Sequence, residues 1–170
     1  MPLKLSIERL KFLLTYDEDS GLFFWNNDMS IKCKSGMQAG NISKSTGYVQ
    51  LMIDRKNYAA HRLAWFYVNG EWPTNQIDHI NGVRNDNKFK NLRQATNKFN
   101  SENRRKIHLN KKSCEYLGVH FYSHKFRNKP WQAEVRCGNK RIYLGYYATP
   151  EEAYKKYVEA KRQYHKGCTI

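Results

Sequence analysis

The sequence lacks any apolar run close to the roughly 20 residues that a membrane-spanning helix needs. Its N-terminal stretch is interrupted by Lys4, Glu8, Arg9 and Lys11, which excludes the uncharged core of a secretory signal peptide. We therefore expect a soluble, cytoplasmic protein that has no membrane partner.

Cysteines are few and widely spaced, at positions 33, 114, 137 and 168. No two of them have the short C-x2–4-C spacing of structural zinc sites, and four scattered thiols give no sign of a disulfide framework. We expect no structural zinc, and reduced thiols that act as small apolar fillers.

Acidic residues are half as numerous as basic ones, 15 against 30, so the net charge is +15. The excess is uneven: residues 1–102 carry 14 Lys+Arg and 10 Asp+Glu, whereas residues 103–170 carry 16 and 5. A strongly basic C-terminal third is typical of a nucleic-acid-binding module joined to a different domain.

The sequence predicts an α+β protein with domains at residues 1–102 and 116–170. Residues 103–115 are polar and basic without periodicity, and either a solvated tether or an arm that touches DNA fits them. In the first domain we expect helices at 7–15 (capped by Ser6), 61–68 (stopped by Gly70) and from Thr96 to about Arg105. Strands are expected at 21–25, 47–53, 58–60, 76–79 and 92–95, with an irregular stretch at 26–45.

In the C-terminal domain, alternating patterns predict three antiparallel strands at 117–122, 131–136 and 141–146. A helix should follow, capped by Thr149 and closed at Gly167. One face of the sheet would pack on this helix, with Trp131 pointing inward. The other face would be left for a partner, and its expected members are His120, Tyr122, Gln132, Glu134, Arg136, Arg141 and Tyr143.

The most informative local feature is the adjacent pair Asp78-His79, followed by Asn91 and Asn100. Such a pair supplies a hard oxygen ligand and a proton acceptor at one point of the chain. A later carboxamide can complete a metal site. These residue types suit metal-assisted cleavage of a phosphodiester.

Residues from Tyr48 to Asn103 resemble the HNH nuclease family, especially its phage-encoded homing endonucleases, which would place the protein in a host-cell cytoplasm. The resemblance implies a ββα-metal nuclease fold. In it His79 would be the general base, Asp78 and Asn100 would hold one Mg²⁺ or Mn²⁺ per active site, and Asn91 would brace the long loop. Other members carry a final His where this chain has Asn100, which favours oxygen-ligated Mg²⁺.

Two further features of this first region are open to more than one interpretation. His61 could be structural or could touch the active site. Residues Asn85, Asp86 and Asn87 are expected to make loop turns rather than to ligate metal.

Residues from Tyr116 to about Lys166 resemble the ethylene-response-factor (APETALA-type) DNA-binding domain. The likeness rests on Tyr116-Leu-Gly-Val119, Trp131-Gln-Ala-Glu-Val-Arg136, Tyr143-Leu-Gly-Tyr-Tyr147 and Thr149-Pro-Glu-Glu-Ala153. Leu117 and His120 depart from the family pattern at positions where basic residues are usual, so the family's target sequence is not carried over. The resemblance implies DNA contacts, which we assign to His120, Arg127, Glu134, Arg136, Lys140, Arg141 and Tyr143.

Together these patterns predict a metal-dependent endonuclease of the homing type that acts on double-stranded DNA. We expect a monomer or weak dimer that nicks as a monomer and needs no small-molecule cofactor. The alternatives are a non-catalytic, sequence-specific DNA-binding regulator and a structure-specific or RNA-directed nuclease.

Overall fold

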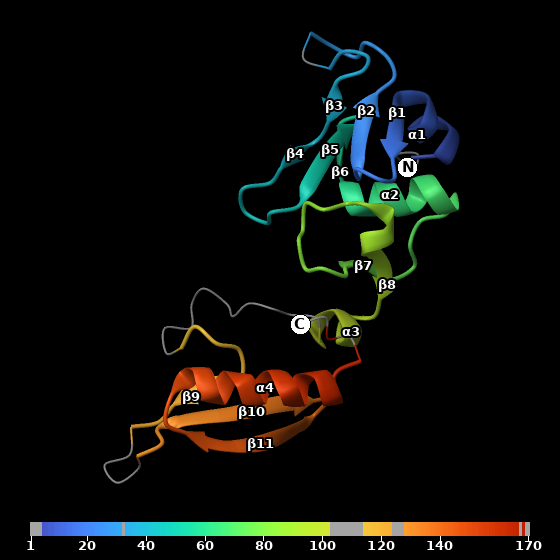
Figure 1. Cartoon of the computed structure of the whole chain (residues 1–170). Helices are drawn as coiled ribbons and strands as arrows, with labels where there is room; N and C mark the ends of the chain where they lie inside the picture. Colours follow the sequence, from blue (N-terminus) through green and yellow to red (C-terminus); the bar gives the residue numbers. More distant parts are fainter. Residues whose placement is uncertain (1–4, 32, 103–113, 124–127, 167, 169–170) are drawn as a thin grey trace. The chain divides into compact units, whose positions relative to one another are not determined.

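The computed structural model describes residues 5–31, 33–102, 114–123, 128–166 and 168. It is a mixed α/β structure with small antiparallel sheets, and its described residues include four α-helices (Figure 1). The chain divides into two compact units, Met1–Thr96 and Asn97–Ile170.

The first unit begins with α1 (Ile7–Leu13), whose first turn is capped by the Ser6 hydroxyl accepting from the Arg9 N–H at 3.2 Å. The helix stops two residues earlier than expected, because Leu14 already pairs with Trp25 in a sheet. This sheet has the order β1-β2-β3, with β1 at Leu14–Asp17, β2 at Leu22–Trp25 and β3 at Gln38–Ala39.

A second sheet has the order β4-β5-β6, formed by Asn41–Ile42, Val49–Ile53 and Lys56–Ala59. Strands β3 and β4 both lie in the stretch that the sequence predicted to be irregular, so that prediction was wrong there. Both strands are two residues long, too short to show an alternating pattern in the sequence.

Helix α2 (Ala60–Asn69) follows β6 directly and ends at Gly70, whose φ of 73° is the left-handed conformation of a helix C-cap. Strands β7 (Gln76–His79) and β8 (Leu92–Ala95) then form an antiparallel pair. Their connecting loop ends in a 3₁₀ turn at Phe89–Asn91. One apolar core, which includes residues of α1, α2 and strands from all three sheets, joins these elements.

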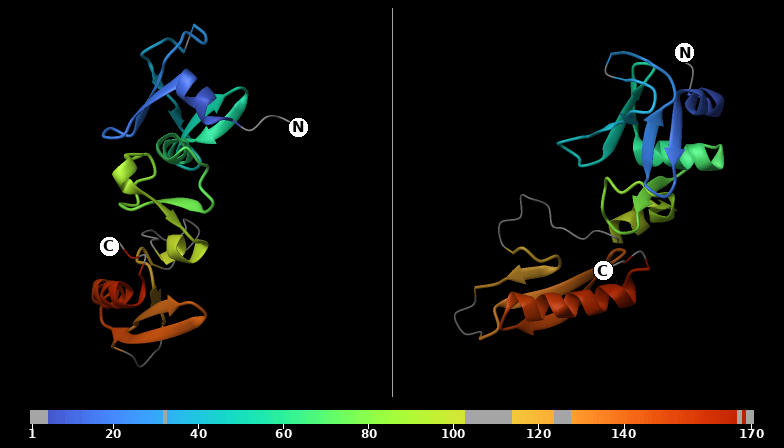
Figure 2. Two further views of the ribbon diagram at one scale, coloured as in Figure 1. Left: turned by 90° about the vertical axis from the view of Figure 1, so that its right-hand side faces the viewer. Right: turned by 45° about the horizontal axis from the view of Figure 1, so that its top comes forward.

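The second unit contains α3 (Asn97–Glu102) and a sheet of order β11-β10-β9. Its strands are β9 (Val119–Phe121), β10 (Trp131–Cys137) and β11 (Lys140–Tyr147). Helix α4 (Pro150–Tyr164) packs along one face of this sheet (Figure 2), and the Thr149 hydroxyl caps it by accepting from the Glu152 N–H at 3.2 Å. The predicted positions of Arg105, Gly167 and most of the 103–115 linker lie outside the described residues.

A β-bulge between Ala133 and Glu134 shifts the register of β11 against β10. On one side of the bulge Tyr143 pairs with Glu134, and on the other Gly145 pairs with Ala133 and Tyr146 with Gln132. The bulge therefore brings both Tyr143 and Tyr146 to the face away from α4, whereas simple alternation would separate them.

No helix among the described residues has the length and apolar character needed to cross a membrane.

Candidate active site and nucleic-acid interface

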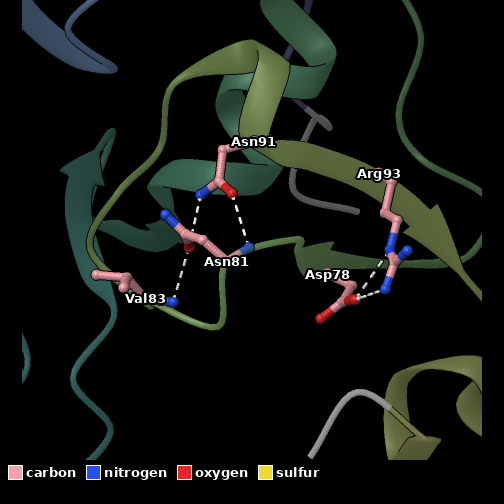
Figure 3. A network of polar contacts seen from close by, with 5 residues as sticks. All are labelled: Asp78, Asn81, Val83, Asn91 and Arg93. Carbon is pink, nitrogen blue, oxygen red and sulfur yellow. Dashed lines mark hydrogen bonds and ion pairs between the residues drawn. The ribbon is translucent and has the colours of Figure 1, made fainter. Parts of the chain in front are cut away.

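Asp78 and His79 occupy the end of β7, and both are buried, although side chains of a strand alternate between its faces. Asp78 faces Arg93 across the β7–β8 pair. Its Oδ2 accepts hydrogen bonds from Arg93 Nε at 3.1 Å and Nη2 at 2.9 Å (Figure 3). The predicted metal ligand is thus an ion-paired carboxylate whose side chain is only 8% exposed.

The orientation of the His79 ring is fixed by Asn87. The Nε2 atom of His79 lies 3.1 Å from Asn87 Oδ1, while Asn87 Nδ2 donates to the Asn85 carbonyl at 3.4 Å. Because the carboxamide uses its NH₂ group on Asn85, its oxygen faces the ring, and His79 Nε2 must be the donor. The neutral ring therefore carries its lone pair on Nδ1.

Two other rings pack against His79. The ring of His61, on α2, lies 5.2 Å from it edge-on, and the ring of Tyr48, just before β5, lies 5.8 Å away. Burial lowers the pKa of His79, and burial together with the neighbouring His79 and Arg62 lowers the pKa of His61 to about 4. Both imidazoles are consequently neutral at pH 7, and His61 Nδ1 has no hydrogen-bond partner among the described residues.

Asn91 holds the β7–β8 loop closed through its carboxamide (Figure 3). Its Oδ1 accepts from the Asn81 N–H at 3.0 Å, and its Nδ2 donates to Asn81 Oδ1 at 3.0 Å and to the Asp86 carbonyl at 2.8 Å. The Ile80 N–H donates to the Asn91 carbonyl at 2.9 Å. These bonds suit the predicted role of Asn91 as a loop brace, since each of them joins Asn91 to another residue of the loop.

The second predicted metal ligand, Asn100, lies on α3 in the second unit and is partly buried, whereas Asp78 belongs to the first unit. Among the described residues, no three His, Cys, Asp or Glu side chains form a group that could hold a metal ion. The pairing of Asp78 with Asn100 therefore remains a prediction.

The face of the β9–β11 sheet away from α4 carries most of the predicted DNA-contacting side chains. His120 and Glu134 form a pair with Nε2 and Oε1 3.6 Å apart, and Arg136 and Arg141, opposite each other in the ladder, are exposed, as is Tyr143. Lys140 is exposed too, but it pairs with Cys137, which has the parity of Ala133 and Val135, so it belongs to the α4 side of the sheet. Arg127 lies outside the described residues. Trp131 packs on the α4 side, as predicted.

Sequence reasoning missed the roles of three residues around these sites. Asn87 was interpreted only as a turn residue, and Tyr48 and Tyr146 had no assigned role in either site. Tyr146 lies 5.5 Å, ring to ring, from Tyr143 and joins the exposed face because of the bulge. Tyr48 and Asn87 contact His79 through tertiary packing, which neither the hydrophobic periodicity nor the motif spacing of the sequence predicts.

A family model described as HNH endonuclease matches residues 58–102, and this match indicates a nuclease that acts on DNA. No curated protein and no solved structure matches the chain. The match contains Asp78, His79, Asn87, Asn91 and Asn100; it begins in β6 and does not reach the N-terminal residues of the domain predicted over residues 1–102. Residues 58–102 are similar to HNH endonucleases, and the similarity spans the boundary between the two units.

Proposed function

We propose that the protein is a metal-dependent endonuclease that hydrolyses phosphodiester bonds of double-stranded DNA, with His79 as the general base. The observation that carries this proposal is the His79 ring itself: it is buried beside Asp78, and Asn87 directs its Nδ1 lone pair away from the amide contact. A ring held in one tautomer can accept a proton in one direction without reorganising.

In the proposed reaction, His79 Nδ1 takes a proton from a water molecule whose oxygen attacks phosphorus. The P–O bond to the 3′ oxygen breaks, and that oxygen leaves with the bond's electron pair and is protonated from solvent. The lowered pKa of His79 keeps the base unprotonated and ready at neutral pH.

The residues present fit a magnesium site better than a zinc site. Asp78 is a single hard carboxylate, and no cluster of three His, Cys, Asp or Glu side chains occurs in the described parts of the chain. Mg²⁺ binds through one or two carboxylates together with water and substrate phosphates, whereas structural zinc needs four N or S ligands. When bound to Asp78, with Asn100 as the proposed second ligand, the cation would stabilise the negative charge that develops at phosphorus.

The second unit would hold the duplex. Its sheet face presents Arg136, Arg141, Tyr143 and the His120–Glu134 pair, with Lys140 exposed at the hairpin end, and residues 103–170 hold most of the net positive charge. Lys and Arg supply phosphate contacts, while Arg, Glu and His can also read base edges. One base in one chain serves one strand, so a monomer would nick the duplex. Double-strand cleavage by a homing-type enzyme would then need two successive nicks or a dimer.

The test is plasmid nicking with Mg²⁺ by the wild type and by His79→Ala. We expect a loss of about 10²–10⁴-fold in rate, the usual cost of a missing general base, with DNA affinity unchanged within a few-fold. His120→Ala is the matched control: it should weaken binding but leave the rate at saturating DNA intact. Nicking by His79→Ala at the wild-type rate would exclude His79 as the base, and an inactive wild type that still bound DNA would favour the regulator.

A further inference from the structure

The loop that carries Asn87 is held by a segment that precedes the family match. The hydroxyl of Tyr16, on β1, donates a 2.6 Å hydrogen bond to the Asn87 backbone carbonyl. Both residues are buried, at 6% and 2% exposed. Two residues later, the Phe89 N–H donates to the Glu18 carbonyl at 3.2 Å.

The turn of the β1–β2 hairpin fits this loop closely. A Cβ atom at Gly21 would lie 2.3 Å from the Lys88 nitrogen and 2.5 Å from the Asn87 carbonyl carbon, so no larger residue fits without displacing backbone. The turn is also braced internally, because the Asp17 carboxylate accepts from the Asp19 N–H at 3.0 Å and from the Ser20 hydroxyl at 2.6 Å. The hairpin therefore offers the loop a rigid surface.

The direction of the Tyr16 hydroxyl is fixed as well. Its ring packs on Phe23, with centroids 4.7 Å apart, and edge-on against Tyr67 at 5.8 Å. Burial raises the pKa of Tyr16 above its usual range, with a further contribution from Glu18, so the phenol keeps its proton and donates at any physiological pH.

We propose that Tyr16 is a positioning residue of the active site, which holds the Asn87 backbone so that the Asn87 amide orients the His79 ring. The chain of contacts runs from Tyr16 Oη to Asn87 O, and from Asn87 Oδ1 to His79 Nε2. The β1–β2 hairpin, which the HNH model does not cover, then belongs to the working nuclease. The effect on cleavage rests on the proposed function; the effect on the ring does not.

The first test compares Tyr16→Phe, which removes one hydroxyl, with Tyr67→Phe, which removes a hydroxyl from the same aromatic cluster. For Tyr16→Phe we expect the single-turnover nicking rate at saturating DNA to fall about three- to tenfold, the factor that one hydrogen bond is worth, with DNA affinity close to wild type. Thermal stability should fall as well, because the buried Asn87 carbonyl loses its partner. Tyr67→Phe should keep the wild-type rate. Equal rates for the two variants would overturn the proposal.

The second test asks whether Tyr16 acts through Asn87. In an Asn87→Ala background, Tyr16→Phe should produce no further loss of rate, because the link to His79 is already cut. Multiplicative losses would show that Tyr16 acts by another route and would overturn the positioning role.

The third test needs no cleavage. Nitrogen-15 spectra of the histidine rings, with His79 assigned through His79→Gln, should show a single Nε2–H tautomer in the wild type. Tyr16→Phe should shift the His79 signals toward a mixture of tautomers, and Tyr67→Phe should not. Unchanged signals in Tyr16→Phe would overturn the inference, whereas a wild type that shows the predicted tautomer but never cuts DNA would overturn only the proposed function.

Discussion

The surroundings of His79 and the face of the C-terminal sheet place polar groups in opposite ways. Around His79, rings and amides from four separate segments meet in a buried space: Tyr48, His61, Asn87 and, behind Asn87, Tyr16. On the sheet, the charged side chains come from neighbouring strands and point toward solvent. The first arrangement fixes geometry and keeps imidazoles neutral, while the second leaves charges hydrated until a partner arrives.

This difference predicts how each region responds to substitution. In the buried site, each group has few partners and little water, so a single change leaves another group misplaced or unpaired. On the exposed face, water replaces the lost interactions of a removed charge, so the free energy of unfolding changes little. The loss should appear only as weaker binding to DNA.

The largest effect is expected at the metal. Asp78→Ala should lower nicking at a fixed Mg²⁺ concentration by about a hundredfold or more, because the cation is worth several kcal/mol to the transition state and Asp78 brings the only negative charge that we assign to it. Asn100→Ala should also raise the Mg²⁺ requirement, but less. A Mg²⁺ titration of nicking rate measures both.

Arg93→Ala is the matched control for that titration. It breaks the same ion pair as Asp78→Ala but keeps the carboxylate, so it should not raise the Mg²⁺ requirement. Wild-type titrations for both Asp78→Ala and Asn100→Ala would mean that the metal site lies elsewhere.

The same contrast explains what the sequence could predict. Alternation located β9, β10 and β11, the helix caps at Ser6 and Thr149 are confirmed, and β7 and β8 lie where expected. A period of two predicts which side chains lie on each face of the sheet. The exposed face could therefore be predicted except for Tyr146, which the bulge at Ala133 and Glu134 moves to that face.

Only part of the buried site could be predicted from the sequence. Asp78, His79 and Asn91 stand out because they are close in sequence and of the right chemistry. The contacts from Tyr16, Tyr48 and His61 join residues up to 71 positions apart, and packing decides them rather than local pattern. His61 was left open between a structural and an active-site role, and its ring contact with His79 supports the second.

The next effect concerns stability and pH. His61 has a pKa of about 4 in the folded protein against about 6.5 in the unfolded chain, so the unfolded state binds the extra proton. The free energy of unfolding is therefore unaffected by the protonation of His61 above about pH 7. As the pH falls from 6.5 to 4 it decreases progressively, by roughly 3 kcal/mol at most. The neighbouring His79, whose pKa is also lowered, should act in the same direction.

His61→Phe separates this effect from other titrations, because it keeps an aromatic ring against Tyr48 and His79 but cannot be protonated. Urea unfolding at pH 7.5 and pH 4.5 should show a smaller loss of free energy of unfolding in His61→Phe than in the wild type. An identical loss in the two proteins would mean that His61 is not buried in a neutral form.

The smallest effects should come from the sheet face, and there the kind of change matters more than its size. Arg136→Ala and Arg141→Ala should each weaken binding by about 1–3 kcal/mol if the guanidinium groups read base edges, and each should relax sequence preference at a different position of the site.

Arg9→Ala removes the same charge from an exposed ion pair in the first unit, so it controls for net charge and should leave binding almost unchanged. The measurement is affinity for preferred and scrambled duplexes over a range of salt concentrations. Contacts to phosphate alone would instead weaken both duplexes equally and reduce the salt slope by about one for each arginine. Equal weakening would show that the face holds DNA without reading it, so sequence preference would have to arise elsewhere in the chain.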